Sequence, residues 1–102
     1  MSVVTNLIFT CDQDDCARML KVNEYFKPTR GLVNCDAVEQ RGWYGGTKML
    51  EADIYIGAFN GLHLPDFLDH LRTISWQFPD TVQLIVKKED DEQFRIITLE
   101  KQ

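Results

Sequence analysis

Cysteine and histidine are the residues of this chain best suited to nucleophilic chemistry. The chain has three cysteines, Cys11, Cys16 and Cys35, and two histidines, His63 and His70. A helix start can lower the pKa of a thiol, and a nearby imidazole can act as its base. The spacing brings no cysteine and histidine together, and Cys16 falls on the apolar stripe of a predicted helix. We therefore expect the cysteines to be packing residues and the protein not to be an enzyme.

The same residues do not have the pattern of a metal or cofactor site. A structural zinc site needs four ligands, usually arranged as two close pairs. Cys11 and Cys16 are separated by four residues, and Cys35 stands alone. We expect no metal and no cofactor. A reducing compartment suits an odd number of thiols, although the sequence leaves a disulfide between two of them open.

The most unusual local sequence is the glycine-bearing segment 41–48, Arg-Gly-Trp-Tyr-Gly-Gly-Thr-Lys. A phosphate loop would need the lysine before the threonine and a helix after the glycines, whereas a strand is predicted next. Two interpretations stay open. Either the glycines form a turn that folds Trp43 over the core, or Arg41, Trp43 and Tyr44 form a contact site. We favour packing for Trp43 and contact for Arg41 and Tyr44.

Acidic and aromatic side chains alternate with aliphatic ones over residues 49–59. Because successive side chains of a strand point to opposite faces, we expect the even-numbered residues to face the core. Glu51, Asp53 and Tyr55 would then lie on the opposite face of the sheet. The same alternation adds Asp36 from a neighbouring strand. Such a face is either solvated or a contact surface for a basic partner.

Hydrophobic periodicity predicts the elements that position these residues. Segments with an apolar period of 2 indicate strands, and segments with a period of 3.6 indicate helices. Strands are expected at 3–10, 32–38, 49–59, 82–87 and 94–99, and helices between 12 and 26 and from 65 onward. This order predicts an α+β fold, a ferredoxin-like βαββαβ(β) two-layer sandwich. It has an antiparallel sheet with two helices on one face.

The two predicted helices carry start signals and apolar stripes. Asp12 is expected to cap the first helix, with Asp15 in a capping-box position. In the second helix we expect Asp66 and His70 to pair on the solvent side. The apolar stripe of that helix consists of Leu64, Phe67, Leu68 and Leu71.

Length and composition indicate one compact domain spanning residues 1–102. Hydrophobic residues make up 44% and charged residues 26% of the chain, close to the average of globular proteins. The net charge of −5 argues against direct binding of nucleic acid, which needs clustered lysine and arginine. No apolar run is long enough for a membrane span, and we find no secretory signal. We therefore expect a cytoplasmic protein that contacts no membrane.

These observations favour a small acidic interaction protein that binds and inhibits another protein. Its acidic side chains would attract a partner with a basic surface. Immunity proteins that neutralise toxins and phage-encoded anti-defence inhibitors share this size and charge, which is an analogy of composition alone. The expected partner-binding residues are Asp36, Arg41, Trp43, Tyr44, Glu51, Asp53 and Tyr55.

Two other functions stay open. A small-molecule-binding or catalytic domain would use a cleft between the Gly42–Gly46 loop and the second helix. Arg41, Lys48 and His63 would be its polar groups. A homodimeric structural module would instead hide sheet surface between two copies.

Overall fold

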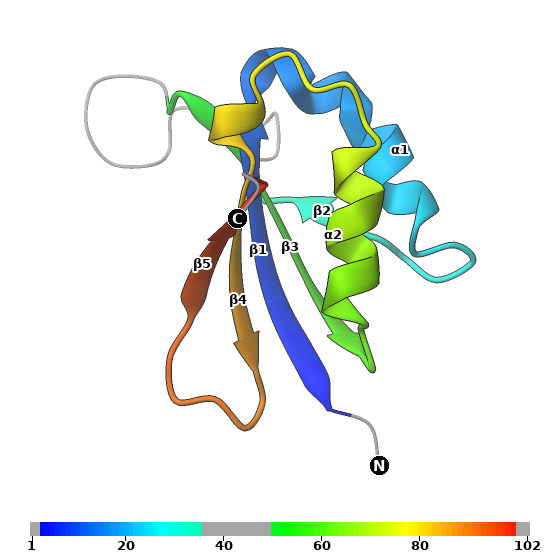
Figure 1. Cartoon of the computed structure of the whole chain (residues 1–102), viewed down its shortest axis with the longest axis vertical. Coiled ribbons are helices and arrows are strands. Elements are labelled where there is room, and N and C mark those ends of the chain that lie inside the picture. Colours follow the sequence, from blue (N-terminus) through cyan, green and yellow to red (C-terminus); the bar gives the residue numbers. More distant parts are fainter. Residues whose placement is uncertain (1–2, 36–49, 100–102) are drawn as a thin grey trace.

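A computed structural model describes residues 3–35 and 50–99 (Figure 1). The strands are β1 (Val4–Asp12), β2 (Val33–Asn34), β3 (Ala52–Asn60), β4 (Gln83–Lys88) and β5 (Arg95–Thr98). The helices are α1 (Met19–Glu24) and α2 (Leu64–Arg72), with 3₁₀ turns η1 (Gln13–Arg18) and η3 (Pro79–Thr81). Among the described residues, no helix has the length and apolar character needed to cross a membrane.

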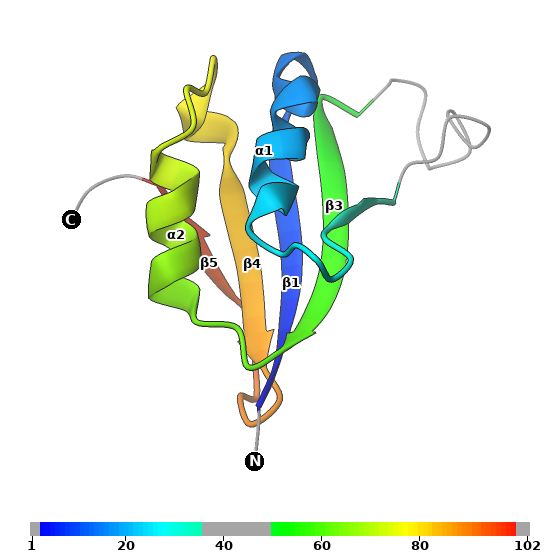
Figure 2. The same cartoon turned by 90° about the vertical axis from the view of Figure 1, so that its right-hand side faces the viewer.

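The described strands form one antiparallel sheet in the order β2-β3-β1-β4-β5. The central strand β1 pairs with β3 on one side and with β4 on the other. Helices α1 and α2 lie on the same face of this sheet (Figure 2). The prediction of an α+β fold with an antiparallel sheet and two helices is confirmed. The last strand, β5, extends the sheet beyond β4.

The chain enters its first helix through a 3₁₀ turn directly after β1. Asp12 caps this turn as predicted, because its carboxylate accepts a hydrogen bond of 2.9 Å from the backbone N–H of Asp14. The capping-box prediction for Asp15 was wrong. The Asp15 carboxylate is buried and accepts hydrogen bonds of 2.9 and 3.0 Å from the backbone N–H groups of Gln77 and Phe78. Asp15 therefore joins the 3₁₀ turn η1 to the chain segment after α2.

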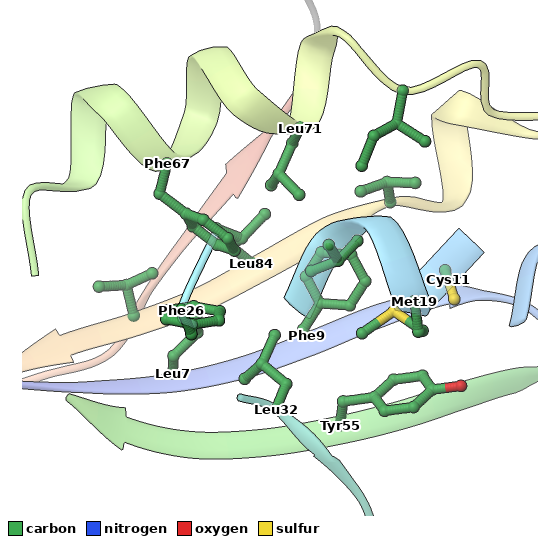
Figure 3. Packing of buried hydrophobic residues seen from close by; sticks show 14 of the residues in the cluster. Leu7, Phe9, Cys11, Met19, Phe26, Leu32, Tyr55, Phe67, Leu71 and Leu84 are labelled. Carbon is green, nitrogen blue, oxygen red and sulfur yellow. The ribbon is translucent and has the colours of Figure 1, made fainter. Parts of the chain in front are cut away.

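The core lies between the sheet and its two helices (Figure 3). Leu7 and Phe9 project from β1 toward the helices, and Phe67 and Leu71 meet them from α2. Each of these four side chains is at most 1% exposed, and burying one contributes about 1.5–3 kcal/mol. Further buried contributions come from Met19, Val22, Phe26, Leu32, Val82, Leu84 and Val86. The predicted apolar stripe of α2 is confirmed for Leu64, Phe67 and Leu71, which are buried.

The prediction that the even-numbered side chains of β3 face the core was wrong. Asp53 and Tyr55 are only 6% and 7% exposed, whereas Ile56 is 47% exposed. The odd-numbered side chains of β3 therefore point toward the helices. The register explains this, because Tyr55 pairs with the inward-facing Phe9 of β1 and Ile56 pairs with Ile8. Large apolar residues occur at both the odd-numbered and the even-numbered positions of β3. The sequence of this strand alone therefore does not show which set faces the core.

The expected ion pair on α2 also differs from the structure. Asp66 pairs with His63, whose Nδ1 lies 3.1 Å from the Asp66 carboxylate. His70 instead places Nε2 2.7 Å from the carbonyl oxygen of Lys21 on α1. The hydrogen bond from His70 ties the two helices together, so this side chain has a packing role.

Candidate functional site

The face of the sheet opposite the helices carries a row of β-branched aliphatic side chains, one from each described strand. Register places Val33 beside Ile56, Ile56 beside Ile8, Ile8 beside Ile85, and Ile85 beside Ile96. We call these five residues the aliphatic row. Directly opposed residues of neighbouring strands have Cβ atoms about 4.5–5.5 Å apart, so the row is continuous.

Water reaches a large part of the aliphatic row. Val33 is 41% exposed, Ile56 47% and Ile96 66%, while Ile8 and Ile85 in the middle are partly buried. Single exposed apolar residues are ordinary on protein surfaces, but contiguous apolar patches mark contact sites. The open face of this sheet therefore has the character of a contact surface.

The two rows of side chains beside the aliphatic row are almost entirely uncharged. One flanking row consists of Ile54, Thr10, Gln83 and Thr98, and the other consists of Ala58, Asn6 and Lys87. Lys87 is the one charged residue in these three rows, and none of them contains a carboxylate. In residues 3–35 and 50–99, the exposed acids Glu51, Asp90 and Glu92 lie outside these three rows.

The open face is hollowed at one end. A hollow of about 610 Å³ extends from Arg30 and Val33 beside β3 across Ile8 and Ile56 to Phe94, which precedes β5. Phe94 is 47% exposed and supplies an aromatic wall to this hollow. A concave apolar surface with a polar rim gives a partner side chain a place to insert.

The acidic turn between β4 and β5 has a defined geometry. The Glu89 carboxylate accepts a 2.6 Å hydrogen bond from the backbone N–H of Val4, and the Asp91 carboxylate accepts one of 3.1 Å from Lys88. Asp90 and Glu92 remain exposed beside these carboxylates and contribute negative charge at the end of the sheet.

A second group of chemically active side chains lies buried on the helix-bearing side of the sheet. Burial, followed by the charges of Asp53 and Asp15, raises the pKa of the Cys11 thiol to about 12. Burial and the neighbouring Asp53 also raise the pKa of Tyr55, whose hydroxyl lies 3.5 Å from the Asp53 carboxylate. Both groups stay protonated at neutral pH, so Cys11 is a poor nucleophile. This cluster supports packing and not catalysis.

The cysteines do not all occupy the positions expected from the sequence. Cys11 is buried as expected, but Cys16 and Cys35 are exposed, and all three are free thiols. Cys16 lies in a 3₁₀ turn and not in a regular α-helix, so the predicted apolar face with a period of 3.6 residues does not include it.

In residues 3–35 and 50–99, no group of three or more His, Cys, Asp or Glu side chains is arranged to hold a metal ion.

The structure describes three of the predicted partner-binding residues. Asp53 and Tyr55 belong to the buried side of the sheet, whereas Glu51 is exposed and its partner-binding role stays a prediction. Four other predicted contact residues lie outside the described residues and stay predictions: Asp36, Arg41, Trp43 and Tyr44. Of the polar groups expected in a ligand cleft, Arg41 and Lys48 also lie outside them, and the exposed His63 pairs with Asp66.

The residues that sequence reasoning missed are the outward isoleucines. Ile8 and Ile85 each point outward from a strand whose inward-facing residues are clearly apolar. One such isoleucine on one strand carries little information. The signal arises only when strand register places the isoleucines of several strands in one line, and the register is not readable from a single sequence.

Comparison of the chain with protein-family models, with curated proteins and with solved structures found no significant match. Function has to be inferred from the residues themselves.

Proposed function

We propose that this protein is a non-enzymatic interaction protein that binds and inhibits another protein. The open face of its sheet, with the aliphatic row and the two flanking rows, is the proposed contact surface. The observation that supports this most strongly is the continuous line of aliphatic side chains across all described strands, in which Val33, Ile56 and Ile96 are exposed and Ile8 and Ile85 are partly buried. This surface replaces the acidic and aromatic face expected from the sequence, because Asp53 and Tyr55 are buried.

The free energy available at this surface is mainly hydrophobic. Full burial of an isoleucine side chain is worth roughly 1.5–3 kcal/mol, so covering the exposed half of Ile56 contributes about 1 kcal/mol. Ile96 has more area to lose and contributes slightly more. A partner that covers the whole row and inserts a side chain beside Phe94 gains several such contributions.

Charge favours a partner with a basic surface. The net charge of −5 attracts a cationic protein over distances limited by salt screening. Exposed acids such as Glu51, Asp90 and Glu92 stand outside the three rows of the open face. In this arrangement acidic groups speed the encounter, and aliphatic contacts then hold the complex.

Two finer assignments belong to this proposal. Strand β3 lies between β1 and β2, as in the split βαβ units of ferredoxin-like sandwiches, with β5 as an added edge strand. We propose the ferredoxin-like topology for this fold.

The exposed free thiols of Cys16 and Cys35 suit a reducing compartment, which supports a cytoplasmic location.

Comparative affinity purification from the native host tests the proposed function. The tagged wild-type protein is compared with the double variant Ile56→Thr, Ile96→Thr. Threonine keeps the β-branched shape and removes most of the apolar character. The matched control is Leu20→Thr on α1, since Leu20 is 79% exposed and lies outside the sheet.

A protein captured by the wild type and by Leu20→Thr, but lost with the double variant, is the expected result. If all three forms capture the same proteins, the open face is not the contact surface. Thermal unfolding of each variant, followed by circular dichroism, shows that the loss does not come from unfolding.

A further inference from the structure

We infer that a second copy of this chain covers the open face when no other partner is bound. Two sheets would pack face to face, with one aliphatic row against the other, as a symmetric dimer. The inference rests on the proposed function, because self-association and partner binding would use the same surface and exclude one another.

The size of the open face is sufficient for a weak dimer. The three rows hold five, four and three residues. With strands about 4.8 Å apart and rows about 6.8 Å apart, these positions have a footprint of roughly 400 Å². Two such faces bury on the order of 800 Å² of flat area, and the accessible area of projecting side chains is larger. Specific interfaces begin at about 1,200 Å² in total. We therefore expect dissociation in the micromolar range.

Symmetry makes the three rows complementary to themselves. A two-fold axis that runs along the aliphatic row, between the two sheets, places Ile8 opposite Ile8 of the other copy. The same axis exchanges the flanking rows, so that Lys87 of one copy faces Gln83 of the other. Asn6 likewise faces Thr10 of the other copy. Like charges do not meet, although the whole molecule carries a net charge of −5.

The absence of carboxylates from the three rows is what allows this contact. Two molecules of net charge −5 repel each other at a distance, and acids on the joining faces would add a large local cost. The acids at Asp90, Glu92 and Glu51 stand outside the footprint, where water and salt screen them. A face of this kind is the part of the molecule that a second copy can approach most closely.

Sedimentation equilibrium of the full-length protein, from micromolar to millimolar concentration, tests the inference. The mass should rise from 11.9 kDa toward twice that value as the concentration increases. Because a dimer contains each substitution twice, Ile56→Thr with Ile96→Thr should weaken it about 100-fold. Leu20→Thr, on the opposite side of the sheet, should leave the dissociation constant unchanged.

A charge exchange at Gln83 tests the arrangement of the two faces. In the proposed dimer, Gln83→Glu places a carboxylate opposite Lys87 of the other copy and should lower the dissociation constant about threefold. Gln83→Lys places a second positive charge there and should raise the dissociation constant by a similar factor. Within one chain the two side chains lie about 13 Å apart along β4, beyond the screening length of roughly 8 Å. Simple repulsion between acidic molecules predicts the opposite order, because Gln83→Glu makes each copy more negative.

Each other outcome overturns the inference in a specific way. A protein that stays at 11.9 kDa throughout, yet captures a host protein through Ile56 and Ile96, excludes the second copy and leaves the proposed function standing. A dimer unaffected by the double threonine variant forms through another surface. A dimer that Gln83→Glu weakens does not join row to row. Should the double variant fail to fold, the two Gln83 variants still decide the question, since Gln83 is exposed.

Discussion

The rings of Tyr55 and Phe9 lie edge to face on the helix-bearing side of the sheet, with centroids 6.3 Å apart and planes at 69°. This contact fixes the orientation of β3, because the side chains on either side of Tyr55 must then point to the opposite face. Ile56 is consequently part of the open face and pairs there with Ile8. The proposed contact surface therefore depends on a ring packed in the core.

Tyr55→Ala should lower the free energy of unfolding by about 3 kcal/mol, because it removes a buried aromatic ring beside Phe9. Ile56→Ala, one residue further along β3, should cost less than about 1 kcal/mol, since half of that side chain is in water. Urea unfolding of the two variants measures both values. Equal losses would contradict the orientation of β3 described above.

The buried Asp15 carboxylate should be a major stabilising group. Replacement by alanine leaves the backbone N–H groups of Gln77 and Phe78 without their acceptor and removes the ion pair with Arg18. We expect Asp15→Ala to cost about 2–4 kcal/mol. The control is Asp14→Ala in the same turn, where the exposed side chain contributes only a favourable charge near the helix start. Chemical unfolding that shows the same loss for both variants would disprove the role of Asp15.

The Cys11 thiol should resist alkylation in the native protein. Its pKa is raised to about 12, so almost no thiolate forms near pH 8, and the side chain is buried. Iodoacetamide should modify the exposed Cys16 and Cys35 under native conditions and reach Cys11 only after unfolding. Peptide mass spectrometry identifies the modified sites. Rapid native labelling of Cys11 would be incompatible with its position in the core.

The same pKa shift predicts a loss of stability in alkaline solution. The folded state holds the Cys11 proton up to about pH 12, whereas an unfolded thiol loses it near pH 9. Since the unfolded chain binds fewer protons in this interval, the free energy of unfolding falls as the pH rises from about 9 to 12. Burial raises the pKa of Tyr55 as well and acts in the same direction. Cys11→Ala should make the decline shallower, as measured by urea unfolding at several pH values, and an unchanged slope would contradict the assignment.

Acidic groups beside the open face should control the rate of association and not the lifetime of the complex. Asp90→Asn with Glu92→Gln should slow binding of the captured protein severalfold at low salt and leave dissociation unchanged. Ile56→Thr with Ile96→Thr should instead accelerate dissociation. Surface plasmon resonance at two salt concentrations separates the two effects. An equal effect of the acidic variants on both rates would argue for direct contact of these acids with the partner.

Much of the fold could be predicted from local sequence because its signals are local. The apolar stripe of Leu64, Phe67 and Leu71 and the cap at Asp12 each arise from residues a few positions apart. The antiparallel sheet and its two helices follow from the order of such segments. These parts of the prediction are confirmed.

The candidate site could not be predicted in the same way, because it depends on residues far apart in the chain. The faces of β3 are set by its pairing with β1, more than 40 positions away, since Tyr55 and Ile56 are both plausible core residues. Asp15 finds its hydrogen-bond donors 62 and 63 positions further on. When both sets of alternate residues in a strand are apolar, a single sequence does not show which set will face the core after the strand pairs with its neighbour.

The most direct test of the contact surface is methyl NMR of the isoleucines while the captured protein is added. We predict that the methyl signals of Ile8, Ile56, Ile85 and Ile96 shift or broaden together. Ile74, which is buried in the core, serves as the internal reference and should stay unchanged. Unperturbed signals from the aliphatic row in a complex that forms all the same would show that this protein meets its partner elsewhere.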